Sequence, residues 1–202
     1  MSRLHPTRTR AVAGRPGHRS WRALRLALAL AAGASLAYAQ GTPAAVGPAS
    51  PDREASSESA VTAQLLELVN RARAEARTCG PERYAGAPAL RRQPPLDAAA
   101  RAHVRDLSAR GAFDLRGSDG STTEARVERE GYRWSGIGEN LADRHLAPEP
   151  IVQGWLTDPM QCSNIMHPAF TEVGLARSTP EPGSSAGVVW SMVVARPRAQ
   201  PR

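Results

Sequence analysis

The chain of 202 residues is poor in aromatic residues, has only two cysteines and contains no lysine. Two cysteines are too few for a disulfide-dense scaffold or for a four-cysteine metal site. No apolar run reaches the length of about 20 residues that a membrane-spanning helix needs. With 41% hydrophobic residues, the chain is instead typical of a single globular domain.

Acidic residues are missing from the first 39 positions, which carry seven arginines. These seven arginines account for the whole formal net charge of +7, so the rest of the chain is neutral. Binding to the phosphate backbone of a nucleic acid needs a basic surface on the folded domain. We therefore expect neither DNA nor RNA as a partner.

An export signal is predicted at the N-terminus. Residues 26–39 (LALALAAGASLAYA) are apolar, follow Arg22 and Arg25, and end in a small-x-small pattern at Ala37 and Ala39 that a signal peptidase accepts. We expect a signal peptide over residues 1–39, with a retained anchor or a buried N-terminal helix as the alternative. After cleavage no stable membrane span remains, so the protein is predicted to be secreted or periplasmic. Residues 40–59, rich in Pro, Ser and Ala, are predicted to be a flexible linker.

The predicted export also bears on whether the two cysteines are paired. Cysteines in an oxidising compartment are usually paired, so we predict a disulfide between Cys79 and Cys162. Closing a loop of this length contributes about 4 to 5 kcal/mol when only loop entropy is counted, and native strain reduces that figure.

The folded part shows helical spacing first and strand-like segments last. We expect helices over residues 61–77, 96–110, 121–130 and 148–156, and strands over residues 172–176 and 187–195. Gly111 is expected to end the second helix, and Ser121 with Glu124 has the spacing of a capping box. His103 falls on the buried side of the second helix. These elements predict an α+β domain.

Many short motifs appear in an order that is known from one family. They are Leu68-Val-Asn-Arg-Ala-Arg73, Ala102-His-Val-Arg-Asp-Leu107, Gly111-Ala-Phe113, Gly117-Ser-Asp-Gly-Ser121, Gly131-Tyr132, Gly138-Glu-Asn-Leu-Ala142, Gly154-Trp155, Cys162-Ser-Asn-Ile-Met166 and Phe170-Thr-Glu-Val-Gly174. The series resembles the bacterial branch of the CAP superfamily, also called SCP-like, over residues 60–198, leaving 199–202 as a tail. The resemblance implies a three-layer α-β-α sandwich with a central antiparallel sheet, and it also favours the Cys79–Cys162 pairing.

The resemblance also implies a site of two glutamates and two histidines, which can hold a divalent metal or transfer protons. The glutamates are present as Glu139 and Glu172, but the positions of the histidines hold Leu115 and Gln161. Leucine cannot ligate a metal, and a glutamine amide has no titratable nitrogen. Two carboxylates alone suit Ca²⁺ or Mg²⁺ better than zinc, and those ions need more oxygen ligands. We therefore expect no cofactor; should zinc or calcium bind, Glu139, Glu172 and His167 are the candidate ligands.

Three histidines are candidates to replace the missing imidazoles. His103 is expected in the core, His145 in a solvated loop, and His167 directly after the Asn-Ile-Met segment, which makes His167 the best substitute. Glu139 has an equally strong architectural interpretation, in which its carboxylate holds a loop by hydrogen bonds. Glu172 has an alternative interpretation too, as one partner of a surface pair with an arginine.

Three functions remain as hypotheses. The first is a secreted, non-catalytic binding module for an extracellular or envelope ligand, in which the site has lost both histidines at Leu115 and Gln161. The second is a carboxylate-based hydrolase that uses Glu139 or Glu172, assisted by His167. The third is lipid or sterol binding in a hydrophobic groove. The sequence specifies neither the ligand nor the oligomeric state.

Overall fold

The computed structural model describes residues 51–145, 147–178 and 187–199. The predicted signal peptide, the linker up to residue 50 and the last three residues lie outside this part, so signal cleavage stays a prediction. Within the described residues, no helix is long and apolar enough to cross a membrane.

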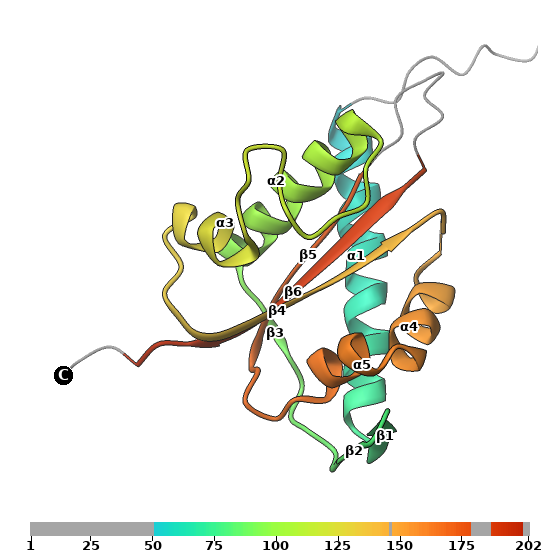
Figure 1. Cartoon of the computed structure of the whole chain (residues 1–202). Helices are drawn as coiled ribbons and strands as arrows, with labels where there is room; N and C mark the ends of the chain where they lie inside the picture. The colour runs from blue at the N-terminus through green and yellow to red at the C-terminus, as the bar shows by residue number, and fades with distance from the viewer. Residues whose placement is uncertain (1–50, 146, 179–186, 200–202) are drawn as a thin grey trace, which may run out of the picture. The chain divides into compact units, whose positions relative to one another are not determined.

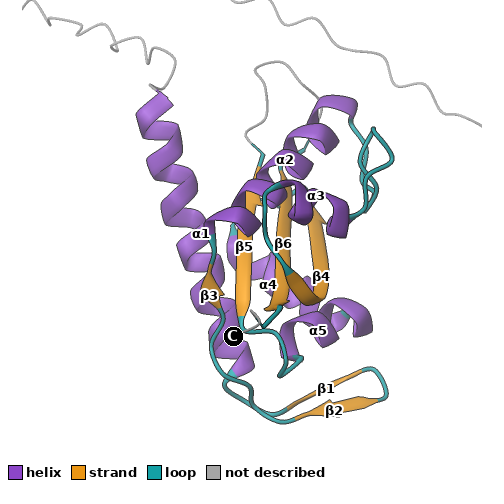
Figure 2. Ribbon diagram, turned by 90° about the vertical axis from the view of Figure 1, so that its left-hand side faces the viewer, coloured by secondary structure: helices purple, strands orange, loops and turns teal. Residues whose placement is uncertain are grey.

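The domain has three layers, with a four-stranded sheet between two groups of helices (Figure 1). The strand order across the sheet is β3 (Arg91–Arg92), β5 (Glu172–Arg177), β6 (Val189–Pro197) and β4 (Trp134–Asp143). One face is covered by α1 (Pro51–Arg73), α4 (Pro148–Thr157) and α5 (Pro159–Met166), and the other by α2 (Pro94–Arg110) and α3 (Thr123–Arg129), as Figure 2 shows from the side. The predicted α-β-α sandwich is confirmed.

The sheet is antiparallel through β5, β6 and β4, and the two-residue strand β3 adds a parallel edge. Because side chains alternate along each strand, the two faces carry different cores. Val173, Trp190 and Met192 belong to the core under α1, α4 and α5. Val193 and Ala195 belong to the core under α2 and α3.

Helix α1 begins at Pro51, so residues 51–59 are helical and the prediction of a linker there is wrong. This segment lacks large apolar residues, which is why its composition resembled a linker. The helix is held by contacts that composition does not reveal: the Thr62 hydroxyl donates to the carbonyl of Glu58 at 2.8 Å, and the Glu58 carboxylate pairs with Arg101 of α2 at 2.7 Å.

Strand β4 is a second difference from the prediction, because no strand was expected over the Gly-Glu-Asn segment. The glycines and charged residues of this segment are untypical of a strand. It nevertheless pairs with β6 along its length, from Trp134 opposite Pro197 to Asp143 opposite Val189. Helix α5 and the hairpin of β1 (Arg77–Cys79) and β2 (Glu82–Tyr84) were also not predicted. The cap of α3 is Thr122 rather than Ser121, since the Thr122 hydroxyl accepts from the backbone of Ala125 at 3.4 Å.

Two connections hold the α1, α4 and α5 side together. The predicted disulfide is confirmed: Cys79 and Cys162 are bonded, with their Cα atoms 5.5 Å apart, and join β1 to α5. The guanidinium of Arg73 is fully buried and donates to backbone carbonyls of four residues: Pro88, Ile165, His167 and Phe170. Burial lowers the pKa of Arg73 from its ordinary value, and these carbonyls provide the partners that a buried cation needs.

Helix α2 lies against the sheet at Gly174, where a methyl group would overlap the backbone of Leu96 and Asp97. We predict that Gly174→Ala lowers the free energy of unfolding by about 3 kcal/mol, since backbone on both sides prevents relaxation. Thermal or urea unfolding measures this. The matched control is Gly154→Ala in α4, where a Cβ meets nothing within 4 Å and the helix gains up to about 1 kcal/mol. Equal effects of the two changes would contradict the close approach.

Candidate functional site

The carboxylate of Glu139 lies in the middle of β4 and is closed off from solvent. One of its oxygens, Oε2, accepts hydrogen bonds from the Thr123 hydroxyl and from Nη2 of Arg126, both at 2.6 Å. The other oxygen accepts from the Ser191 hydroxyl of β6 at 2.6 Å. The side chains of Glu139 and Arg126 are 1% and 5% exposed. Helix α3 thereby supplies two of the three donors, and the sheet supplies the third.

Arg126 connects this ion pair to the loop that precedes α3. Its guanidinium also donates to the carbonyls of Ser121, at 3.0 Å, and Leu115, at 3.1 Å. Leu115 stands where the family resemblance implied the first histidine. Its backbone is therefore tied to the site, whereas its side chain is 47% exposed and offers no ligand.

Glu172, at the start of β5, is also buried. It accepts from the Tyr132 phenol at 2.6 Å and from the Gln93 amide at 2.8 Å, and it lies 3.9 Å from the exposed guanidinium of Arg91. Burial, followed by the hydrogen bond to Glu172, raises the pKa of Tyr132 above its ordinary value. The phenol therefore stays protonated and keeps donating to the carboxylate.

The two carboxylates share a face of the sheet but are separated by β6. Glu139 lies opposite Val193, and Glu172 lies opposite Ala195. Two strand spacings and an offset of two residues along β6 place their backbones about 12 Å apart, with β6 between them. Among the described residues, no three His, Cys, Asp or Glu side chains are grouped so that they could hold a metal ion.

Gln161, at the position of the second histidine, belongs to the first turn of α5. Its carbonyl accepts from the Asn140 amide at 2.9 Å, and the Asn164 amide donates to the Asn140 oxygen at 2.9 Å. Because Asn140 directly follows Glu139 in β4, its side chain points to the opposite face of the sheet. The backbone at Gln161 is thus anchored on the side away from the Glu139 carboxylate.

Of the three candidate histidines, His103 is buried and His145 lies in an exposed loop, as predicted, whereas His167 does not lie with the glutamates. His167 is exposed, with its ring 5.0 Å from Phe170 on the α1 side, and forms no ligand group with the glutamates. His145 is also exposed, and its backbone carbonyl accepts a hydrogen bond from the Trp190 indole at 2.8 Å. His103 is buried, and its Nε2 lies 3.0 Å from the backbone carbonyl of Asp114.

The arginine pair expected for Glu172 is present with Arg91 at 3.9 Å, but the hydrogen-bond partners of the two carboxylates were not predicted from the sequence. Thr123, Arg126 and Ser191 surround Glu139, and Gln93 and Tyr132 hold Glu172. Arg126 lies in the short helix α3 and is buried there. Its burial depends on how α3 packs on the sheet, which local spacing does not encode.

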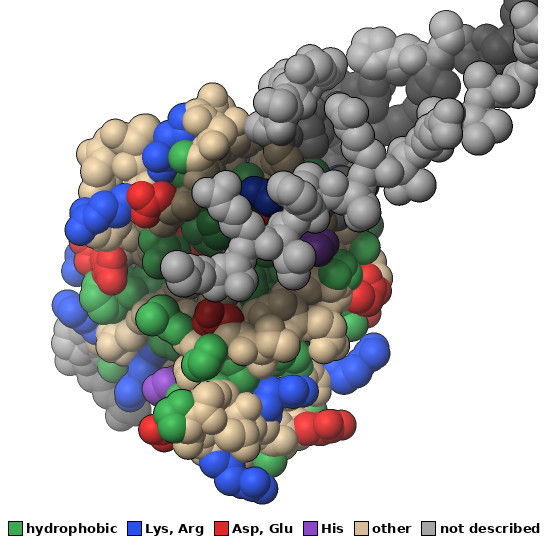
Figure 3. All heavy atoms as spheres, turned by 45° about the vertical axis from the view of Figure 1, so that its right-hand side comes forward, with side chains coloured by type: hydrophobic (Ala, Val, Ile, Leu, Met, Phe, Trp, Pro, Cys, Tyr) green, Lys and Arg blue, Asp and Glu red, His purple; other side chains and the backbone are tan. Residues whose placement is uncertain are grey.

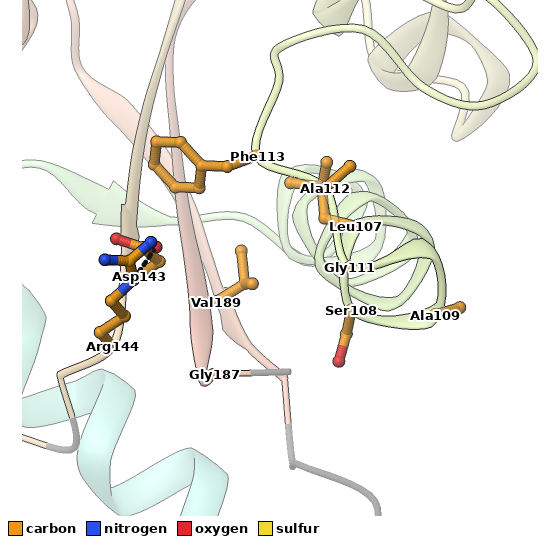
Figure 4. A pocket seen from close by; sticks show the side chains of 10 residues that line it. All are labelled: Leu107, Ser108, Ala109, Gly111, Ala112, Phe113, Asp143, Arg144, Gly187 and Val189. Carbon is orange, nitrogen blue, oxygen red and sulfur yellow. Dashed lines mark ion pairs between the residues drawn. The ribbon is translucent and has the colours of Figure 1, made fainter. Parts of the chain in front are cut away.

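A separate cavity of about 430 Å³ lies between the C-terminal end of α2 and the ends of β4 and β6 (Figure 4). Phe113 extends from the loop after α2 toward β4, and Val189 lies between the two elements. At the rim, Asp143 pairs with Arg144 at 3.0 Å. Neither glutamate lines this cavity.

Comparison with known proteins decides the family. The family model described as "CAP: Cysteine-rich secretory protein family" matches residues 66–194, which is most of the described domain. The chain belongs to the CAP family. A curated relative, the uncharacterized protein YkwD of Bacillus subtilis (strain 168), is 27% identical over 120 residues, covering 59% of this chain and 43% of the relative. The match thus spans less than half of that protein.

Solved structures agree on the fold. An extracellular protein containing an SCP domain from Bacillus anthracis str. Ames has a TM-score of 0.60 at 22% identity, covering 74% of this chain and 45% of that one. An outer surface protein from Borrelia burgdorferi has a TM-score of 0.53 at 13% identity, covering 69% of this chain and 92% of that one. At these identities the likeness concerns the fold alone.

The buried ion pair gives a first prediction for the site. Glu139→Gln leaves the Arg126 cation buried without its counter-charge, so we expect the free energy of unfolding to fall by about 3 to 5 kcal/mol. Replacing both residues, as Glu139→Leu with Arg126→Met, should recover much of that loss. Denaturant unfolding of the single and double variants measures the coupling. The control is Arg129→Gln, which breaks an exposed pair with Asp119 and should leave stability unchanged.

His103 gives a prediction about pH. Burial lowers its pKa, and the charge of Arg126 adds to this, whereas Glu139, Asp106 and the carbonyl of Asp114 oppose it. The unfolded chain therefore takes up a proton that the folded protein resists. Stability is complete above the unfolded pKa of about 6.5 and falls as the pH drops through it. We expect the free energy of unfolding of His103→Gln to depend less on pH between pH 7 and pH 5 than that of wild type. An identical pH dependence of the two proteins would contradict this.

Proposed function

We propose that this CAP-family protein of bacterial type is a non-catalytic binding module that acts outside the cytoplasm. The observation that carries the proposal is the state of Glu139. Its carboxylate is 1% exposed and accepts from Arg126, Thr123 and Ser191 at 2.6 Å each. A general base must come within hydrogen-bond reach of the proton it removes, and this arrangement leaves no room for a substrate.

The side chains present do not fit the divalent metal that the family resemblance implies. Zinc sites use imidazole, thiolate and carboxylate ligands, and here Leu115 and Gln161 replace the two imidazoles. Cys79 and Cys162 are bonded to each other. Both carboxylates are already held by donors, and β6 separates them. The residues present therefore do not support metal-dependent chemistry.

The hydrolase alternative would require Glu139 to leave Arg126, or Glu172 to leave Tyr132 and Gln93. His167, the proposed assistant, is exposed and contacts Phe170 rather than either glutamate. The lipid or sterol alternative needs an apolar groove. The cavity of about 430 Å³ instead carries Asp143 and Arg144 at its rim. Neither alternative has a supporting arrangement among the described residues.

Two observations support a location outside the cytoplasm. The Cys79–Cys162 disulfide suits an oxidising compartment. Two structural relatives are described as an extracellular protein and an outer surface protein. Together with the predicted signal peptide, these favour a secreted or periplasmic protein.

Calorimetric titration of Zn²⁺ and of Ca²⁺ into the purified chain tests the proposal, alongside assays with ester and peptide substrates. We expect neither stoichiometric metal binding nor substrate turnover, because the carboxylates of Glu139 and Glu172 are both occupied by donors of the protein. Glu172→Gln is the matched variant, since it leaves the Glu139–Arg126 pair intact. One-to-one metal binding or turnover that disappears in Glu172→Gln would overturn the proposal.

A further inference from the structure

A pocket with a volume of about 380 Å³ lies at the other end of the sheet from the cavity in Figure 4. It is lined by six residues: Glu128, Gly131, Tyr132, Arg133, Trp134 and Arg198. They come from the end of α3, the turn into β4 and the residues just after β6. A volume of this order accommodates one or two sugar-sized units.

Two arginines line this pocket. Trp134 pairs with Pro197, so Arg133 and Arg198 are the next opposing residues, and the backbone of Arg198 donates to the carbonyl of Arg133 at 2.9 Å. Like charges directly opposite on neighbouring strands are destabilising. Both side chains are exposed, and neither takes part in an ion pair within the described part of the chain. Within the described residues, no ion pair compensates these two positive charges.

The aromatic walls of the pocket are fixed in place. The indole nitrogen of Trp134 donates to Glu128 at 3.1 Å, and the phenol of Tyr132 donates to the buried Glu172 at 2.6 Å. Glu128 is the single acid among the six lining residues, against two arginines. A ligand thus meets a preformed aromatic surface with a net positive charge, so little ordering is needed on binding.

We propose that this pocket binds a carboxylated sugar, such as a uronic acid unit of an envelope or extracellular polysaccharide. Guanidinium groups bind carboxylates with two parallel hydrogen bonds, and two of them supply the counter-charge that such a ligand needs. The indole offers its electron-rich face to the C–H groups of a sugar ring.

The overall charge favours a ligand with few charges over a nucleic acid. Residues 40–202 carry no net charge, and acidic and basic side chains are interspersed on the face shown in Figure 3. A nucleic acid presents one charge per about 1.7 Å and needs an extended basic surface. A single pair of arginines in a neutral domain matches one carboxylate or two.

This inference deepens the proposed binding function by naming a ligand class, but its site is distinct from Glu139. The two can fail separately. Metal-dependent turnover would overturn the non-catalytic proposal and leave this pocket untouched, whereas absence of sugar binding would overturn only the inference.

The test is calorimetric titration of digalacturonate into the purified chain at low ionic strength, with its neutral dimethyl ester in parallel. We expect saturable binding of the acid and at least tenfold weaker binding of the ester. Arg133→Gln and Arg198→Gln should each weaken binding of the acid at least tenfold, while Arg83→Gln, an exposed arginine of β2, should not. Arg133→Gln should unfold at the same or a higher temperature, because it removes the repulsion.

Three results would overturn the inference: no saturable binding of the acid, equal binding of acid and ester, or equal binding by the two pocket variants and wild type. Inorganic phosphate and a single-stranded oligonucleotide serve as competitors. Either one binding more tightly than digalacturonate would replace the carboxylated sugar with a phosphate ligand.

Discussion

The buried ion pair between Glu139 and Arg126 is the interaction on which the α2–α3 side of the domain depends. Two charges taken out of water cost several kcal/mol each unless every donor and acceptor is satisfied. Here the carboxylate has three donors, and the guanidinium also binds the carbonyls of Ser121 and Leu115. The same contacts fix α3, the loop before it and strands β4 and β6. Because these elements share one pair, none can move without exposing a buried charge.

In the binding module proposed above, this arrangement accounts for a glutamate of the family site that is kept without its chemistry. In a catalytic or metal-binding site, carboxylate lone pairs must be free to meet a ligand. At Glu139 they are used inside the protein, and at Glu172 by Tyr132 and Gln93. Leu115 and Gln161 offer no imidazole that would compete for these carboxylates. Both glutamates are therefore buried, with their carboxylates hydrogen-bonded inside the domain.

Local patterns in the sequence predicted the elements that local patterns determine. The spacing over 96–110, ended by Gly111 in a left-handed conformation, and the apolar runs that became β5 and β6 were visible without tertiary information. Strand β4 was not, since its glycines and Glu139 are accommodated only by pairing with β6 and by the donors of α3. The site was half predictable: Glu139 and Glu172 could be named, but their partners depend on the burial of Arg126 and Tyr132, which arises from packing.

Arginine has two opposite uses in this lysine-free chain, and the number of acceptors around it distinguishes them. Arg73 and Arg126 are buried, and each donates to several carbonyls or carboxylates, a task suited to a planar group with five donors. Arg133 and Arg198 have the same donors, but both are exposed and neither takes part in an ion pair within the described residues. A guanidinium surrounded by acceptors serves the fold. An exposed pair keeps its donors available for the anion proposed above.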